Sequence, residues 1–278
     1  MQGSLYLCAT PIGNLEDITL RVLRILKEVD LIAAEDTRNS IKLLNHFEIK
    51  TPLTSYHEYN RIEKAIQLID RMRAGQNVAL ITDAGTPAIS DPGEDLVRLC
   101  HEAGICVTSL PGACACITAL TLSGLPTTRF AFEGFLPKDK KRRAFLLSKL
   151  KEETRTIIFY ESPHHLKKTL DDLFVTFGDR NIRLCRELTK KYEESKGFLL
   201  SEALSYYQEH DPRGEYVLVL AGKSEQELKE EQQKVWEEMS ITEHMFFYED
   251  QGIDHKEAMK RVAKDRGVSK REVYAALL

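Results

Sequence analysis

The chain has 278 residues, of which 42% are hydrophobic and 8% aromatic. This length exceeds one average domain and provides enough apolar side chains for a sizeable core. The formal net charge of −4 and pI near 6.1 exclude a protein whose whole surface binds nucleic acid, although they permit a local basic patch.

Apolar, strand-like runs alternate with amphipathic helical patterns through the first half of the chain. In the pattern at 18–28, Ile18, Val22 and Ile25 share one face, as expected of a helix that covers a sheet. The alternation predicts an α/β domain, doubly wound around a parallel sheet. The predicted strands are 4–9, 30–34, 52–56, 77–82 and 105–110, and the predicted helices are 18–28, 37–46, 60–74 and 93–104.

A further helical run, after Pro111 and Gly112, ends at residues 123–126, where Gly and Pro occur in the order that stops a helix. We therefore expect residues 1–124 to form the first domain and residues 125–223 to form a second α/β layer. The second layer is predicted to contain strands at 129–135, 156–161, 182–188 and 214–221, and helices at 138–151, 164–177 and 201–209.

The composition changes after Gly222 to an acidic helical stretch followed by a basic end. Residues 224–278 are therefore predicted to form a small helical unit. Its last part, 255–278, reads as a helix, a turn and a helix capped by Ser269. This pattern resembles a helix-turn-helix only weakly, and a solvated helical hairpin that packs on the core or on a partner subunit fits it equally well.

Residues 82–93 form the most informative loop, because they follow a buried-strand pattern and contain two Gly and two Pro. At the carboxyl end of a strand in an open α/β sheet, small residues let a ligand approach the backbone, and Asp83 can bind hydroxyl or amino groups. An ordinary strand-to-helix turn is the alternative, but such turns usually need only about 2–6 residues. The loop therefore favours ligand binding.

The six cysteines lie mostly inside apolar runs, and no signal peptide precedes the first predicted strand. We interpret them as core residues of a cytoplasmic protein. Cys114 and Cys116 have no second Cys or His pair nearby that would complete a zinc site, so no metal site is expected. No apolar run approaches the roughly 18–20 residues of a membrane span, so no membrane insertion is expected.

Four segments, in order along the chain, match one family: ATPIGNLED at 9–17, AEDTR at 34–38, DAGTP at 83–87 and FYESPH at 159–164. Through them the chain closely resembles the ribosomal RNA small subunit methyltransferase I family, within the tetrapyrrole-methylase superfamily. The resemblance covers about residues 4–222 and implies two α/β domains with S-adenosylmethionine in the cleft between them. It also implies a homodimer that methylates the ribose 2′-hydroxyl of a decoding-centre cytidine in 16S rRNA. We expect the substrate to be an assembled 30S subunit, because a regional basic surface on an acidic protein suits docking on a shaped target.

The resemblance also implies which residues bind the cofactor. They come from the loops after the first, fourth and fifth strands and from two strand ends of the second domain. These residues are Pro11, Ile12, Gly13, Asp83, Ala84, Gly85, Thr86, Pro87, Ala113, Cys114, Ala115, Tyr160, Glu161 and Leu188. The first loop lacks the Gly-x-Gly-Pro-Gly-Asp pattern of the tetrapyrrole enzymes, which favours an RNA enzyme.

Methyl transfer to an alcohol needs alignment of the reacting atoms and removal of a proton. Candidate bases lie at polar strand ends of the first domain: Glu35, Asp36 and His57. An unperturbed imidazole accepts a proton near neutral pH, which favours His57. Two structural alternatives stay open, because His57 can simply bind the loop or RNA, and Glu35 and Asp36 can cap the helix that starts at Thr37.

Basic residues near these loops are candidates for RNA contacts. Arg38 and Arg61 follow the polar strand ends, and a guanidinium binds phosphate oxygens well. A run of five cations stands at a predicted helix start, where positive charge is unfavourable, so phosphate contact is favoured over a solvated face. The run comprises Lys138, Lys140, Lys141, Arg142 and Arg143, and Lys190 is a further candidate after a second-domain strand. Tyr56, Tyr59 and Phe135 are either stacking groups or packing residues.

Two other functions fit the sequence less well. A methyltransferase that acts on a carbon of a tetrapyrrole precursor would share the fold but would not need the basic run. A non-enzymatic regulator would bind nucleic acid through residues 240–278 and use the α/β body as a ligand sensor.

Overall fold

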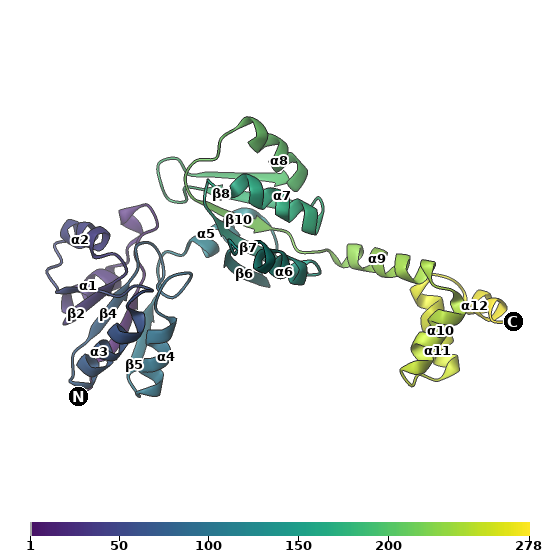
Figure 1. Ribbon diagram of the computed structural model, residues 1–278, viewed down its shortest axis with the longest axis horizontal. Coiled ribbons are helices and arrows are strands. Elements are labelled where there is room, and N and C mark those ends of the chain that lie inside the picture. The colour runs from purple at the N-terminus through teal and green to yellow at the C-terminus, as the bar shows by residue number, and fades with distance from the viewer. Residues whose placement is uncertain (1) are drawn as a thin grey trace. The chain divides into compact units, whose positions relative to one another are not determined.

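The computed structural model describes residues 2–278, apart from some side chains between residues 225 and 237. The chain forms two compact units. One contains both predicted α/β layers and comprises the chain up to Lys151 together with Arg155–Ala221. The other is helical and comprises Glu152–Thr154 with Gly222–Leu278. The predicted boundary at residue 124 thus lies inside the first compact unit. Figure 1 labels most of the helices and strands of both units.

The first sheet is parallel throughout, with strand order β3-β2-β4-β1-β5. Alternate side chains of β4 enter the two cores on its faces: Leu80 packs with α3 and α4, whereas Ile81 packs with α1 and α2. The predicted doubly wound α/β domain is therefore confirmed. Its elements are β1 (Ser4–Cys8), α1 (Leu20–Glu28), β2 (Leu31–Ala34), α2 (Thr37–His46), β3 (Leu53–Ser55), α3 (Arg61–Arg73), β4 (Val78–Ile81), α4 (Glu94–Glu102) and β5 (Cys106–Leu110), with a 3-10 turn at Leu15–Asp17.

The second sheet is mixed, with strand order β6-β7-β10-β8-β9. Only β6 and β7 pair in parallel, and the other neighbours are antiparallel. Helices α6, α7 and α8 pack on one face of this sheet. The strands are β6 (Phe130–Phe135), β7 (Thr156–Glu161), β8 (Asn181–Arg186), β9 (Glu194–Leu199) and β10 (Tyr216–Leu220), and the helices are α6 (Lys140–Leu150), α7 (Leu166–Phe177) and α8 (Leu200–Glu209).

Two features of this half differ from the sequence analysis. Strand β9 was not predicted, because its half-buried side chains alternate with exposed ones and it contains Gly197 in place of an apolar run. Helix α5 (Ala115–Ser123) was assigned to the first domain, but Cys116, Ala119 and Leu120 pack against the second sheet. The second α/β layer therefore begins before residue 125 in terms of packing.

The helical unit contains α9 (Glu225–Glu238), α10 (Ile241–Asp250), α11 (His255–Asp265) and α12 (Lys270–Ala276). Its small core includes Met245, Val262 and Val273, from three different helices. Ser240, Asp254 and Ser269 cap the N-termini of α10, α11 and α12. In the described part of the chain, every helix is too short or too polar to cross a membrane.

Candidate active site

Three loops at the carboxyl ends of β1, β4 and β5 are bonded to one another. The backbones of Thr10 and Gly85 exchange hydrogen bonds of 2.9 and 3.0 Å. The Thr86 hydroxyl donates to the carbonyl of Ala113 at 2.9 Å. Gly85 has a φ of +89°, which a residue with a side chain rarely adopts. These hydrogen bonds therefore hold the three loops that were predicted to bind the cofactor side by side.

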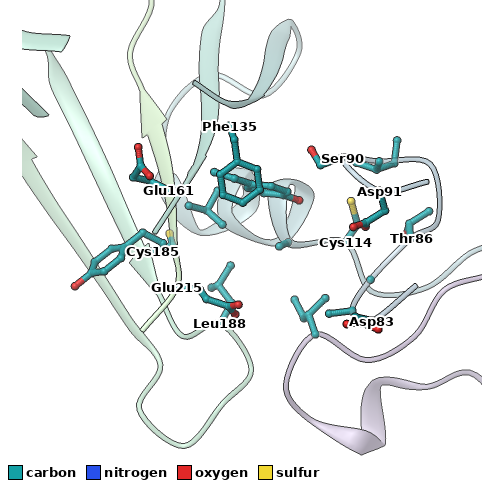
Figure 2. A pocket seen from close by; sticks show the side chains of 18 of the residues that line it. Asp83, Thr86, Ser90, Asp91, Cys114, Phe135, Glu161, Cys185, Leu188 and Glu215 are labelled. Carbon is teal, nitrogen blue, oxygen red and sulfur yellow. The ribbon is translucent and has the colours of Figure 1, made fainter. Parts of the chain in front are cut away.

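These loops face the second sheet across a cavity of about 360 Å³, within the usual size of small-molecule sites (Figure 2). Ten of the fourteen predicted cofactor residues line it: Ile12, Asp83, Ala84, Gly85, Thr86, Cys114, Ala115, Tyr160, Glu161 and Leu188. Pro11 and Gly13 line a neighbouring cavity instead. Pro87 and Ala113 line neither of these cavities, although Ala113 supports Thr86 from behind.

The second sheet contributes side chains that are held in place by hydrogen bonds. The Tyr160 hydroxyl accepts a hydrogen bond from the backbone N–H of Cys116 at 3.1 Å. Phe135 meets the Tyr160 ring edge-on at 5.6 Å between centroids. Glu161 accepts hydrogen bonds from the Thr169 hydroxyl and from the backbone N–H of Ser162. This wall of the cavity therefore combines aromatic rings with a hydrogen-bonded carboxylate.

Three carboxylates, those of Glu35, Asp83 and Asp91, line the opposite wall. Burial and the neighbouring charges of Glu35 and Asp83 raise the pKa of Asp91 to about 7. Burial and the charge of Asp83 also raise the pKa of Glu35. A cationic ligand would stabilise the charged forms of both carboxyls, because it offsets the repulsion among the three carboxylates. The sequence analysis missed Asp91, and the only available signal was its position in the loop at 82–93.

Cys114 and Cys116 bring their sulfur atoms to 3.4 Å at the start of α5. A hydrogen bond from the Cys116 thiol lowers the pKa of Cys114 to about 6, and the same interaction raises the pKa of Cys116. Cys114 lines the cavity and is only partly buried. Among the described residues, no cluster of three metal-binding side chains occurs.

Comparisons with known proteins agree with this architecture. Residues 4–204 match the family model described as Tetrapyrrole (Corrin/Porphyrin) Methylases. A protein of Halalkalibacterium halodurans called Ribosomal RNA small subunit methyltransferase I is 52% identical over 274 residues, 98% of this chain and 94% of that protein. The chain belongs to this methyltransferase family. A relative of the same name from Bacillus subtilis is 48% identical and covers 99% of this chain and 94% of its own length.

Solved structures confirm the fold of this family member. A uroporphyrin-III C-methyltransferase of Thermus thermophilus, complexed with S-adenosylhomocysteine, has a TM-score of 0.55 at 19% identity and covers 79% of this chain and 97% of its own. A cobalt precorrin-4 methyltransferase has a TM-score of 0.56 at 18% identity, covering 78% of this chain and 94% of its own. The predicted tetrapyrrole-methylase fold is thus confirmed. The predicted cofactor agrees with the first neighbour, because S-adenosylhomocysteine is what S-adenosylmethionine becomes after methyl transfer.

The three candidate bases of the methyltransferase have different surroundings. Asp36 caps α2 by accepting the Arg38 backbone N–H at 2.8 Å, and hydrogen bonds from Arg38 lower its pKa to about 2. The capping alternative therefore describes Asp36, and the same contacts make it a weaker base than a free carboxylate. Glu35 lines the cavity. His57 lines neither cavity, and its buried Nδ1 has no hydrogen-bond partner among the residues that the structure describes.

The candidate RNA-binding residues of α6 fall into two groups, because four are exposed and one is buried. Lys138, Lys140, Lys141 and Arg142 are exposed at the start of α6. Arg143 is buried, and it bonds to Asp172 at 2.5 Å and to the Thr169 hydroxyl at 2.7 Å. The assignment of Arg143 to an RNA-binding surface is therefore wrong: it lies on the inward face of α6, in line with Leu147 and Leu150.

The remaining three cations are paired with carboxylates. Arg38 is exposed and bonds to Asp36, and Arg61 bonds to Asp95 at 3.1 Å. Lys190 lies at the cavity and bonds to Glu187 at 2.9 Å and Glu215 at 2.8 Å. Of the candidate stacking groups, Tyr56 is fully buried core, whereas Tyr59 is 98% exposed.

Proposed function

We propose that this enzyme transfers a methyl group from S-adenosylmethionine to the ribose 2′-hydroxyl of one decoding-centre cytidine in 16S rRNA. The observation that carries the proposal is the cavity between the two sheets. It is lined by the loops at which the family resemblance is strongest, and it combines apolar walls with a cluster of carboxylates. The names of the relatives support small-subunit rRNA as the substrate.

The cavity suits S-adenosylmethionine in both size and charge. Its carboxylates, Glu35, Asp83 and Asp91, suit the positively charged sulfonium and ammonium groups of that molecule. Apolar side chains on the other walls, Ile12 and Leu188 among them, suit its adenine ring. When bound, the cofactor supplies a methyl group that is activated by positive charge on sulfur.

The protein would then have two tasks. Positioning of the hydroxyl against the methyl group can supply about 7–11 kcal/mol. Acceptance of the hydroxyl proton by a carboxylate would add about 10²–10⁴-fold. Glu35 is the best placed of the three sequence candidates, because it lines the cavity and its raised pKa makes it a stronger base than Asp36. Asp91 shares both properties.

The exposed cations at the start of α6 support contact with RNA phosphates. Lys140, Lys141 and Arg142 lie in the first turn of α6, where positive charge opposes the helix dipole and brings no gain to folding. Asp139 caps this helix through the Arg142 backbone N–H at 2.9 Å, so the turn is well formed. Because the chain is acidic overall, this regional basic surface suits a shaped RNA target such as an assembled 30S subunit in the cytoplasm.

Helix α5 supports a homodimer. It is apolar all round: Ala119 and Leu120 pack on the second sheet, while Ile117 and Leu122 are each 43% exposed on the other side. A helix of this type is usually covered on both sides. A second copy of the chain would provide that cover.

The test is transfer of labelled methyl from S-adenosylmethionine to purified 30S subunits from cells that lack this protein, with the product nucleoside identified by mass spectrometry. A 2′-O-methylated cytidine at a single decoding-centre position is the expected result. Binding of S-adenosylmethionine without incorporation into 30S subunits or free 16S rRNA would contradict the proposal. Methylation of porphyrin precursors by the same preparation would then indicate the tetrapyrrole alternative.

A further inference from the structure

A second cavity, of about 520 Å³, adjoins the first and shares five lining residues with it: Ile12, Asp83, Ala84, Lys190 and Glu215. Its other wall is one face of α2, which presents Asn39, Leu43 and His46 at spacings of three and four residues. The volume is ample for a nucleotide. We assign the S-adenosylmethionine proposed above to the first cavity, where ten of the fourteen predicted cofactor residues lie. The second cavity, which Pro11 and Gly13 also line, then has room for another ligand.

We propose that the second cavity holds the target ribonucleotide of the RNA, with its ribose beside Asp83 and its phosphate at the α2 rim. This inference rests on the proposed function, and it adds the place where that function's substrate binds. RNA enzymes of this kind act on nucleotides that are turned out of their stack into a pocket.

Polar residues of α2 line this cavity. Ser40 is 4% exposed, and among the residues that the structure describes its buried hydroxyl has no hydrogen-bond partner. The polar surface that is open to a ligand therefore comes from its neighbour Asn39, which is exposed. The Asn39 amide donates to Asp83 at 3.1 Å, which leaves its carbonyl oxygen and second N–H available. Donors and acceptors of this type suit a base edge or a ribose hydroxyl.

The rim of the cavity is suited to phosphate. Lys42 is exposed and forms no ion pair with any residue that the structure describes, and His46 stands one turn further along α2. By contrast, Lys190 on the far wall is already bound by Glu187 and Glu215. Lys42 is therefore the free cation of this cavity, where an RNA backbone phosphate would bind.

Asp83 lies between the two cavities and is shared by both. Its carboxylate lines both of them, and it is held by the Asn39 amide at 3.1 Å and the Asp36 backbone N–H at 3.3 Å. A ribose bound beside Asp83 would face the first cavity directly. Such adjacency is what a direct displacement between two bound molecules requires.

Two substitutions test the proposal in the full-length enzyme. Lys42→Glu removes the free cation, and Leu43→Trp fills the cavity. Lys50→Glu is the matched control, because Lys50 is exposed and lies outside both cavities. Each variant is assayed for methylation of 30S subunits at several salt concentrations, and its Kd for S-adenosylhomocysteine is measured by calorimetry.

We expect Lys42→Glu to raise the KM for 30S subunits about ten- to a hundredfold. The slope of log KM against log salt concentration should fall by about one, because one phosphate contact is lost. Leu43→Trp should lower kcat/KM by at least about tenfold, while the Kd for S-adenosylhomocysteine stays within about twofold in both variants. If both variants act on 30S subunits like Lys50→Glu, or if they lose S-adenosylhomocysteine affinity equally, the assignment of this cavity is wrong.

A separate measurement distinguishes this inference from the proposed function. If the wild-type enzyme methylates neither 30S subunits nor 16S rRNA, the proposed function fails. Binding of cytidine 5′-monophosphate, followed by NMR, then tests the cavity directly. Weaker binding to Leu43→Trp than to Lys50→Glu would retain the cavity as a nucleotide site, and equal or undetectable binding to both would overturn it.

Discussion

Gly13 lies against Lys190 so closely that a Cβ at residue 13 would come within 2.4 Å of the Lys190 Cγ atom. It would also lie 2.8 Å from the Thr189 hydroxyl and 3.0 Å from the carbonyl oxygen of Leu188. The loop after β1 therefore touches the segment that follows β8, which contains the cavity residues Leu188 and Lys190. The backbone N–H of Asn14 donates to the same Thr189 hydroxyl at 3.1 Å.

We expect Gly13→Ala to destabilise the protein by about 1–3 kcal/mol, because the stem of Lys190 and the Thr189 hydroxyl must both move and the Leu188 carbonyl lies directly behind them. The Kd for S-adenosylhomocysteine should rise with it, since Leu188 is displaced. Gly104→Ala is the control: its φ of +67° makes a side chain costly, but it meets open space away from the cavity. Chemical unfolding and calorimetry should show lost stability in both variants and lost affinity only in Gly13→Ala.

Arg143 tests the distinction between a folding role and an RNA-binding role. Arg143→Ala leaves Asp172 and Thr169 without their buried partner, and it should destabilise the protein by about 3 kcal/mol in urea unfolding. Affinity for 30S subunits should not change at a temperature where the variant is folded. Lys141→Ala, on the exposed side of the same helix, should show the reverse. An Arg143 variant that is stable but binds RNA weakly would contradict the structural role.

The sequence predicted the first sheet well because its central strands β2 and β4 are buried on both faces. Val78–Ile81 is a continuous apolar run, which has few other interpretations. Strand β9 offers no such run, and its place at the sheet edge beside β8 depends on pairing that only the folded chain reveals. The same limit applies to α5, whose apolar residues suit burial but do not say against which sheet.

The site was partly predictable for a similar reason. Loops that follow strands can be located from the sequence, and most of the proposed cofactor residues line the cavity. The properties of single side chains depend on neighbours distant in sequence. The raised pKa of Asp91 follows first from its burial and then from the charges of Glu35 and Asp83, and no spacing rule in the sequence indicates either cause. The burial of Arg143 could have been predicted, because Arg143 shares one face of the helix with Leu147 and Leu150. The run of positive charges around it favoured the other interpretation.

Asp91 should make both cofactor binding and stability depend on pH. Below about pH 7 its carboxyl is protonated, so the Kd for S-adenosylmethionine should rise as the pH falls from 8 to 6. The change should be smaller for S-adenosylhomocysteine, which lacks the sulfonium charge. Asp91→Asn should flatten the profile of S-adenosylmethionine, and calorimetry at several pH values provides the measurement. An unchanged profile in Asp91→Asn would assign the titration to another group.

The effect on stability has the opposite direction. Because the folded-state pKa of Asp91 is raised above its unfolded value, its contribution is fully present below about pH 4 and is lost as the pH rises through about 7. Asp91→Asn should therefore stabilise the ligand-free protein at pH 8, by about 2 kcal/mol after allowance for solvent screening. At pH 4 the variant and the wild type should unfold at nearly the same urea concentration.

Cys114 should be the most reactive cysteine of the enzyme toward iodoacetamide at neutral pH. Its lowered pKa makes it largely thiolate at pH 7, whereas burial raises the pKa of Cys8, Cys100 and Cys185. Since Cys114 lines the first cavity, saturating S-adenosylhomocysteine should slow its modification. Mass spectrometry of tryptic peptides locates the label. Cys106, which is exposed outside the cavity, is the internal control, because its labelling rate should not respond to the ligand. Equal protection of both cysteines would mean that the ligand acts through the whole fold, and absence of protection at Cys114 would place the cofactor elsewhere.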